Sequence, residues 1–239
     1  MKSLSDEAKA ALAWAHTARF LTTASELDQL QASLLPEIAF VGRSNAGKST
    51  AINSLAQYKR LAFASKTPGR TQHINLFELG PKTAPNCWFA DLPGYGYAAV
   101  ERAAKKRWQK VMADYLVERA ELSGVVLLVD TRLGLTDLDL QLLNYIEPRL
   151  RNGAVKLLVV MTKADKLTKV QGAKALQTSI AQIADIASDG SDISALLFSA
   201  LNKTGLDDFA ITMHAWAHPP LHEASAPVGD ADETVVDAP

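Results

Sequence analysis

A glycine-rich segment between an apolar run and a helical pattern constrains the fold of this 239-residue chain more than any other feature. It reads Gly42-Arg43-Ser44-Asn45-Ala46-Gly47-Lys48-Ser49. This spacing of glycines lets successive backbone N–H groups curl around a phosphate at the positive end of the next helix. Lys48 can then reach the β- and γ-phosphates, and the Ser49 hydroxyl can bind Mg²⁺. The alternative is a glycine turn with an exposed lysine. The strand expected over residues 37–41 and the helix expected from residue 49 favour the phosphate-binding loop.

Apolar runs and helical patterns alternate from residue 36 onward. The apolar runs predict strands over residues 38–41, 74–79, 88–91, 125–130, 156–161 and 195–198. Helices are predicted over residues 5–18, 48–57, 98–119, 137–151, 169–187 and 206–217, with Thr136 as an N-cap. The alternation predicts a three-layer α/β fold of the P-loop NTPase type, with a mostly parallel six-stranded sheet and helices on both faces. The short connection through Pro81 and Pro85 favours a hairpin, so we expect one antiparallel strand.

Composition and charge divide the chain into three parts. We expect an N-terminal helical extension over residues 1–35, a nucleotide-binding domain over 36–218 and a disordered acidic tail over 219–239. The tail has five acidic residues and no Lys or Arg, so the remainder holds 25 basic and 21 acidic side chains, a net charge of +4. A segment rich in Ala, Pro and acidic residues buries too little apolar surface to offset the entropy of ordering it.

Cysteine usage and the first residues indicate the compartment. Cys87 is the single cysteine, so no intrachain disulfide can form and a reducing environment is expected. No apolar run approaches the roughly 18 residues needed to cross a bilayer. The first nine residues carry charges of both signs and lack the apolar core of a signal peptide. We therefore expect a soluble cytoplasmic protein.

A carboxylate ends the third predicted strand, in the segment Asp91-Leu92-Pro93-Gly94. The carboxyl edge of a parallel sheet is where such folds bind ligands. Asp91 could hold Mg²⁺ through water, and the Gly94 N–H could bond a γ-phosphate. An ordinary Asp-x-Pro-Gly turn is the alternative.

Two further segments are suited to recognise guanine. In Thr162-Lys163-Ala164-Asp165, the aspartate can accept hydrogen bonds from guanine N1–H and its exocyclic amine, which adenine lacks at that edge. A carboxylate left unpaired by the wrong base disfavours that base strongly. The Lys163 stem can lie along the base face. After the last predicted strand, Phe198-Ser199-Ala200 should bring backbone N–H groups to the guanine carbonyl. A solvated turn is the alternative for the first segment.

The segment Thr67-Pro68-Gly69-Arg70-Thr71-Gln72 lies between the first helix of the nucleotide-binding domain and the strand over 74–79. A loop at this place must close over Mg²⁺ and the γ-phosphate. Thr71 is the expected second hydroxyl ligand of the metal, and Thr67 is the competing candidate.

Taken together, the motifs GRSNAGKST, TPGRTQ, DLPGYGYA, TKAD and FSA resemble those of the EngB (YihA/YsxC) family of bacterial GTPases, over about residues 20–218. That family lies in a wider group of GTPases that includes Era and the MnmE G domain. The resemblance implies a Ras-like G domain that binds GTP and hydrolyses it, and that acts as a switch in late assembly of the large ribosomal subunit. It also implies a need for the protein in normal cell division and septation.

The resemblance further implies roles for individual residues. Ser49 and Thr71 would be direct Mg²⁺ ligands, with Asp91 acting through water, and the catalytic residues would be Lys48, Asn45 and Thr71. The residues implied in GTP binding are Gly42, Arg43, Ser44, Asn45, Ala46, Gly47, Lys48, Ser49, Thr50, Gly69, Arg70, Thr71, Gln72, His73, Asp91, Leu92, Pro93, Gly94, Thr162, Lys163, Ala164, Asp165, Phe198, Ser199 and Ala200.

Three residues suggest how the reaction would be tuned. Ras-like proteins place a water-orienting Gln where this chain has Tyr95, so we expect slow intrinsic GTP hydrolysis. Asn45 matches the phosphate-loop Asn that helps coordinate K⁺ in related GTPases. The alternative is that Asn45 only satisfies backbone groups of its loop. Thr162 stands where most GTPases carry Asn, and its shorter side chain predicts nucleotide binding in the micromolar range.

A basic stretch follows the second switch segment. We expect contacts to rRNA phosphates from its cations, which are Arg102, Lys105, Lys106, Arg107 and Lys110. The alternative is an ordinary solvated helix face. The expected partners are therefore GTP, GDP and a precursor of the large ribosomal subunit, with no DNA or membrane partner and a monomeric chain. A competing function is a nonenzymatic RNA-binding or ribosome-binding module regulated by GTP.

Overall fold

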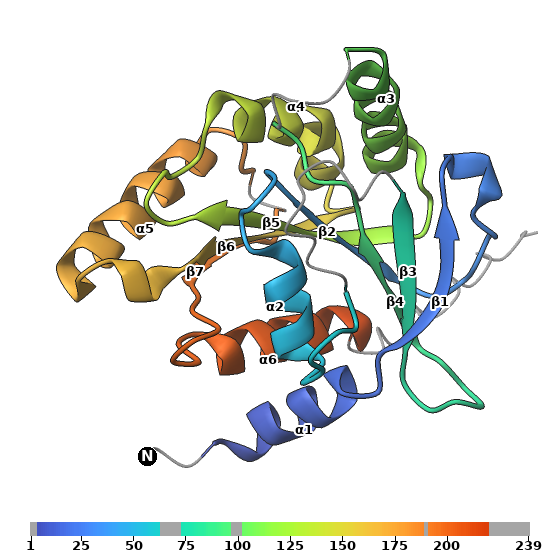
Figure 1. Cartoon of the computed structure of the whole chain (residues 1–239), viewed down its shortest axis with the longest axis horizontal. Coiled ribbons are helices and arrows are strands. Elements are labelled where there is room, and N and C mark those ends of the chain that lie inside the picture. Colours follow the sequence, from blue (N-terminus) through green and yellow to red (C-terminus); the bar gives the residue numbers. More distant parts are fainter. Residues whose placement is uncertain (1–3, 63–72, 97–101, 189–190, 220–239) are drawn as a thin grey trace, which may run out of the picture.

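One seven-stranded sheet separates two layers of helices (Figure 1). The structure is a computed structural model that describes residues 4–62, 73–96, 102–188 and 191–219, with the backbone alone for residues 102–109. The strands are β1 (Arg19–Ala24), β2 (Glu37–Gly42), β3 (Ile74–Leu79), β4 (Cys87–Asp91), β5 (Leu122–Asp130), β6 (Lys156–Thr162) and β7 (Ile193–Leu197). Their spatial order is β1-β3-β4-β2-β5-β6-β7. Strand β3 is antiparallel to both of its neighbours, as expected from the hairpin, and the other pairs are parallel. The predicted α/β class is confirmed.

The central strands read as continuous apolar runs because both of their faces are covered. In β2, Ile38 and Phe40 belong to a core shared with the helices on one face, and Ala39 and Val41 belong to a second core on the other face. Helices α1 (Asp6–Ala15), α2 (Lys48–Leu55) and α6 (Leu206–Ala217) cover the first face. Helices α3 (Arg102–Glu118), α4 (Asp137–Arg151) and α5 (Lys169–Ala184) cover the second (Figure 1). This arrangement leaves the carboxyl ends of the parallel strands free to carry the site.

The helices begin and end close to their predicted limits. Thr136 is the N-cap of α4, and both its backbone N–H and its hydroxyl donate to the Asp139 carboxylate. Helix α3 begins at Arg102, and the earlier start predicted at residue 98 lies outside the described residues. None of the helices in the described part of the chain has the length and apolarity of a bilayer-spanning segment.

The N-terminal segment differs from the prediction. No strand is predicted over residues 19–24, but they form the edge strand β1, so the sheet has seven strands and not six. Arg19 pairs with Glu78 across the two strands, and its Nε donates to the carboxylate at 2.7 Å. Helix α1 packs on α6, where Trp14 is buried. The N-terminal extension predicted over residues 1–35 thus holds the strand β1 in addition to its helix, and the domain limit at residue 36 stays a prediction. The acidic tail from residue 220 lies outside the described residues.

Candidate nucleotide-binding site

Five parallel strands bring their carboxyl ends to one edge of the sheet. The loop from Gly42 to Ser49 leaves β2 there and leads into α2, whose N-cap is Gly47. Asn45 and Gly47 have positive φ values of 67° and 96°. A glycine accepts the second of these at little cost, whereas a side chain there would be strained. The backbone therefore has the curled form that a phosphate-binding loop needs.

The groups expected to meet the phosphates and the metal lie side by side. The ammonium of Lys48 is buried and donates to Oδ1 of Asp91, which ends β4 and is itself 2% exposed. Two backbone hydrogen bonds join the segments on either side of this pair. Ser44 N–H donates to the Tyr95 carbonyl at 2.8 Å, and Tyr95 N–H donates to the Gly42 carbonyl at 3.3 Å. The phosphate loop and the segment after β4 are thus directly connected.

The segment predicted to recognise guanine is connected to the same loop. Thr162, which ends β6, places its hydroxyl 2.5 Å from the Ala46 carbonyl and 3.1 Å from that of Val129, so its single proton goes to Ala46. Lys163 donates from Nζ to the neighbouring carbonyl of the loop, that of Asn45, at 2.6 Å. Lys163 itself has a φ of 58°, which turns the chain sharply at the end of the strand. Two adjacent carbonyls of the phosphate loop are therefore fixed by two adjacent side chains of the base segment.

A cavity of about 380 Å³ opens between these segments. Its lining is drawn from the loop, the base segment and the chain after β7, and comprises Gly47, Thr50, Thr162, Lys163, Asp165, Phe198, Ala200 and Leu201. Ser199 is fully buried, and its hydroxyl donates to Asp165 at 2.7 Å. This hydrogen bond, aided by Lys166, holds the pKa of Asp165 below its ordinary range although partial burial opposes the shift. Asp165 is therefore an ionised acceptor at neutral pH, which is what recognition of guanine N1–H and its amine requires.

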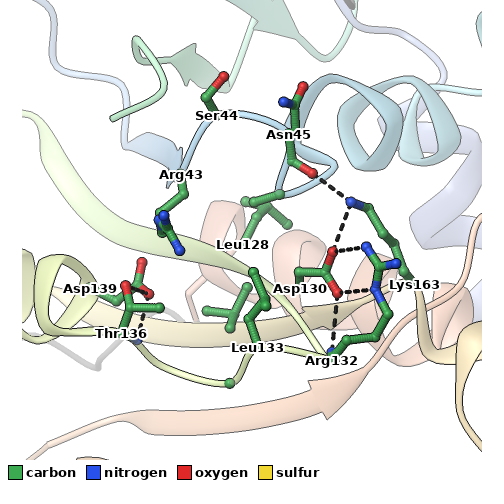
Figure 2. Close-up of a pocket in the computed structure, with 13 residues that line it drawn as sticks. Arg43, Ser44, Asn45, Leu128, Asp130, Arg132, Leu133, Thr136, Asp139 and Lys163 are labelled. Atoms are coloured by element: carbon green, nitrogen blue, oxygen red, sulfur yellow. Dashed lines mark hydrogen bonds and ion pairs between the residues drawn. The ribbon is translucent and has the colours of Figure 1, made fainter. Parts of the chain in front are cut away.

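A second cavity of about 210 Å³ is lined by residues of the phosphate loop, of β5 and of the chain after it, and by Lys163 (Figure 2). Arg43 points into it, whereas the side chains of Ser44 and Asn45 point away from it (Figure 2). The Nε of Arg43 is buried and has no hydrogen-bond partner in the described part of the chain. Arg43 thus lines this second cavity and is absent from the lining of the cavity next to Asp165.

Tyr95 forms part of the packing between the segment after β4 and helix α4. Its side chain is 3% exposed, and its hydroxyl donates to Oδ1 of Asp139 at 2.5 Å. Burial and the neighbouring carboxylate raise the pKa of Tyr95 well above its ordinary value. The position that carries a water-orienting Gln in Ras-like proteins is here occupied by a buried, neutral and already bonded phenol.

Several of the predicted site residues do not line either cavity, or lie outside the residues that the structure describes. Leu92 is fully buried in the core on the α3 and α4 face, so its side chain serves packing. His73 places its ring Nδ1 2.9 Å from the Ser25 hydroxyl and lines neither cavity. Lys110 is exposed and pairs with Asp114 at 2.6 Å. The remaining predicted residues lie outside the described residues or have undescribed side chains, namely Gly69, Arg70, Thr71, Gln72 and the alternative Thr67, together with Arg102, Lys105, Lys106 and Arg107.

Sequence reasoning missed three charged residues and one apolar residue at the site. Asp130 and Arg132 bond each other at the end of β5, Asp139 accepts from Tyr95, and Leu201 lines the base cavity. A signal existed for Asp130, because it is a carboxylate at the end of an apolar strand, as Asp91 is.

The fold and the site define a P-loop GTPase, since the glycine-rich loop, the strand-ending carboxylate of Asp91 and the segment from Thr162 to Asp165 meet at one edge of a mostly parallel sheet. The family model described as "50S ribosome-binding GTPase" matches residues 37–163. The probable GTP-binding protein EngB of Acidovorax ebreus (strain TPSY) is 56% identical over 215 residues, which cover 90% of this chain and 95% of that protein. The protein of the same name from Burkholderia vietnamiensis (strain G4 / LMG 22486) is 45% identical over 216 residues, covering 89% and 97%. The chain belongs to the EngB family of GTP-binding proteins, and GTP binding and hydrolysis are the activities that this membership supports.

Solved structures agree on the fold. A crystal structure of a probable GTP-binding protein engB has a TM-score of 0.56 at 20% identity, covering 76% of this chain and 98% of that one. A crystal structure of Era in complex with MgGDPNP and nucleotides 1506–1542 of 16S ribosomal RNA has a TM-score of 0.58 at 21% identity, covering 76% and 56%. At these identities the likeness supports the architecture alone.

Proposed function

We propose that this chain is a Mg²⁺-dependent GTPase switch that acts in late assembly of the large ribosomal subunit and is needed for normal cell division and septation. The observation that carries the proposal is the connection of the guanine cavity to the phosphate loop, in a member of a family described as 50S ribosome-binding GTPases. Such a connection lets the bound nucleotide control the loops that would meet a ribosomal precursor. The work would take place in the cytoplasm, where ribosomal subunits are assembled.

The residues at the sheet edge fit a magnesium ion carried by the nucleotide. No cluster of three or more His, Cys, Asp or Glu side chains able to hold a metal occurs among the described residues. Mg²⁺ in such sites is held by one carboxylate or hydroxyl together with phosphate oxygens and water, so a full protein cage is not needed. The buried carboxylate of Asp91 can hold Mg²⁺ through a water molecule, and Ser49 and Thr71 are the proposed direct hydroxyl ligands. When bound, Mg²⁺ would neutralise charge on the β- and γ-phosphates.

Each segment has a defined task in this proposal. Lys48 and the loop N–H groups bind the β- and γ-phosphates, and Gly94 N–H senses the γ-phosphate. Asp165 selects guanine, with Ser199 holding its carboxylate in place, and the stem of Lys163 covers the base face. Residues 69–73 and 91–94 are the proposed switch contacts.

Intrinsic hydrolysis should be slow because the chain offers no water-orienting group at Tyr95. Since Thr162 has a single proton and donates it to Ala46, it cannot supply the second bond of an amide, which supports nucleotide affinity in the micromolar range. A titration with labelled GDP that gave nanomolar affinity would remove this expectation. Multiple-turnover assays with and without large subunits separate the switch from a nonenzymatic ribosome-binding module. The nonenzymatic module would be favoured if large subunits do not raise the rate of GTP hydrolysis and if binding to the subunits does not depend on hydrolysis.

K⁺ is the proposed second cation. The side chain of Asn45 is exposed and makes no hydrogen bond to the described residues, so it is not used to satisfy its own loop. An amide oxygen at this place can accept a monovalent cation that offsets charge in the transition state, as an arginine finger does. Turnover measured in KCl and in NaCl should differ for the wild type and become equal for Asn45→Ala. Equal turnover of the wild type in both salts would overturn the K⁺ role.

The proposed RNA contacts lie on α3, which follows the switch segment. Arg102, Lys105, Lys106, Arg107 and Lys110 would bind rRNA phosphates in a salt-sensitive manner. Reversal of Lys105, Lys106 and Arg107 to Glu should remove RNA binding and leave GTP binding intact. RNA binding that survives the reversal would contradict this assignment.

The test of the whole proposal is co-sedimentation with large ribosomal subunits and their precursors at fixed salt. Binding with a nonhydrolysable GTP analogue and not with GDP is expected for an assembly switch. Absence of binding in both states would leave a GTPase without a ribosomal partner, and the proposal would then be wrong.

A further inference from the structure

The ammonium of Lys163 lies between two oxygens that come from different elements (Figure 2). One is the main-chain carbonyl of Asn45 in the phosphate loop, at 2.6 Å. The other is Oδ2 of Asp130, the last residue of β5, at 2.9 Å. Because these two acceptors come from two different elements, the phosphate loop and the end of β5, they fix the far end of a long side chain.

Asp130 is itself held in one orientation. Its side chain is 6% exposed. Arg132 donates from Nε to Oδ1 at 2.9 Å and from Nη2 to Oδ2 at 2.6 Å, and its backbone N–H donates to Oδ1 at 3.1 Å. Burial alone would raise the pKa of Asp130, but the hydrogen bonds from Arg132 and Lys163 hold it far below its ordinary value. Both oxygens are therefore occupied, and the carboxylate is charged over the whole neutral range.

A lysine without these two acceptors would have to be ordered when the nucleotide binds. Its ammonium is a compact, strongly hydrated charge on a flexible stem with three rotatable donors. Ordering such a side chain when a ligand binds lowers the affinity. The charge of Asp130 orders it beforehand, while Lys163 lines the base cavity and its ammonium keeps the Asn45 carbonyl in place.

We propose that Asp130 is a positioning residue for guanine-nucleotide binding, acting through Lys163, with Arg132 orienting its carboxylate. It lines the second cavity and is absent from the lining of the base cavity, so it would act without touching the base. The inference rests on the proposed function, in which residues 162–165 recognise guanine.

Asp130→Asn tests the inference, because the amide has the same shape and lacks the charge. Dissociation of labelled GDP should become about ten-fold faster, since one charge-assisted hydrogen bond on Lys163 is weakened. The KM for GTP should rise by a similar factor, with kcat changed by less than about two-fold because the reacting phosphate is not touched. Asp130→Glu keeps the charge and should return GDP dissociation to within about three-fold of the wild type. Arg132→Met removes the group that orients this carboxylate but keeps its charge and the Asp130–Lys163 pair, so GDP dissociation should become faster by less than in Asp130→Asn.

A double-mutant cycle separates positioning from general stability. If Asp130 acts through Lys163, Lys163→Met and the double variant Asp130→Asn/Lys163→Met should release GDP at the same rate. Additive effects, or a Glu variant that releases GDP as fast as the Asn variant, would overturn the inference. Thermal melts show whether each variant is folded, and a lower melting temperature with unchanged GDP dissociation would also overturn it. If Lys163→Met leaves GDP binding unchanged, the base-recognition role fails and the inference falls with it. If Lys163→Met weakens binding and Asp130→Asn does not, only the positioning role of Asp130 fails.

Discussion

Replacing Tyr95 with phenylalanine separates a structural role of this side chain from a catalytic one. The ring is buried, and its hydroxyl donates to Oδ1 of Asp139 at 2.5 Å. The other oxygen of Asp139 already accepts from Thr136, so the variant would leave one oxygen of a buried carboxylate without its donor. A hydrogen bond to a charged group contributes about 1.5–3 kcal/mol. We therefore expect the free energy of unfolding to fall by about 2 kcal/mol, which lowers the melting temperature by about 4–8 °C in a chain of this size.

Turnover should respond differently from stability. Since the Tyr95 hydroxyl faces α4, its loss should change the kcat for GTP by less than about two-fold. Urea unfolding and a phosphate-release assay on the same preparation measure the two effects. Tyr115→Phe is the matched control, because Tyr115 is also fully buried and donates to a carboxylate, Glu37, which begins β2 at the opposite end of the strand from the phosphate loop. Both variants should lose similar stability. A Tyr95→Phe protein of wild-type stability, or one whose turnover collapses while Tyr115→Phe remains active, would refute the structural role.

Three other substitutions test the base cavity, the packing of α6 on α1, and the core. Asp165→Asn should weaken GDP binding by at least about ten-fold and favour xanthosine nucleotides, since the amide can donate to a carbonyl at C2; unchanged GDP affinity in a titration would contradict this. Burial, followed by the nearby charge of a second imidazole, lowers the pKa of His214. The unfolded chain then binds more protons below about pH 6.5, so stability should be full above that pH and fall as the pH drops through the folded pKa. Urea melts at pH 5.5 and 7.5 should show this, with a smaller difference for His214→Gln. In Gly124→Ala, the new methyl would lie 2.5–2.7 Å from ring carbons of Trp216. The variant should lose about 1–3 kcal/mol of unfolding free energy, whereas Gly172→Ala, which meets its nearest neighbour at 3.4 Å, should not.

The elements that sequence reasoning located well have both faces buried or have strong end signals. The limits predicted for β3, α4 and α6 agree with the observed ones, because each has a clear apolar pattern and a capping or turn residue beside it. Strand β1 was missed because it is a short edge strand with a mixed burial pattern, in which Phe20 is exposed. Its Phe-Leu-Thr-Thr run is rich in residues that favour strands, but the partner that makes it a strand is β3, far along the chain.

For the site, the order of motifs along the chain indicated which segments would meet, because parallel strands place their carboxyl ends together. The sequence could not show which side chains would bond each other. Lys163 and Asp130 are 33 residues apart, and Tyr95 and Asp139 are 44 apart, so their pairing depends on register and side-chain direction.

Hydrogen bonds at the sheet edge join the proposed phosphate-binding loop to the proposed base-recognition segment. The carbonyls of Asn45 and Ala46 are taken by Lys163 and Thr162, so the curl of the phosphate loop depends on the conformation of the base segment. A change in either segment should therefore alter affinity for the whole nucleotide and not for one end of it. The hydrogen bond from Ser44 to Tyr95 extends this connection to the proposed switch, and Tyr95 extends it to α4. A γ-phosphate that displaced Gly94 would therefore also displace Tyr95, its neighbour in the chain, and through the Tyr95–Asp139 hydrogen bond helix α4. Helix α4 lies on the same face of the sheet as the basic helix α3.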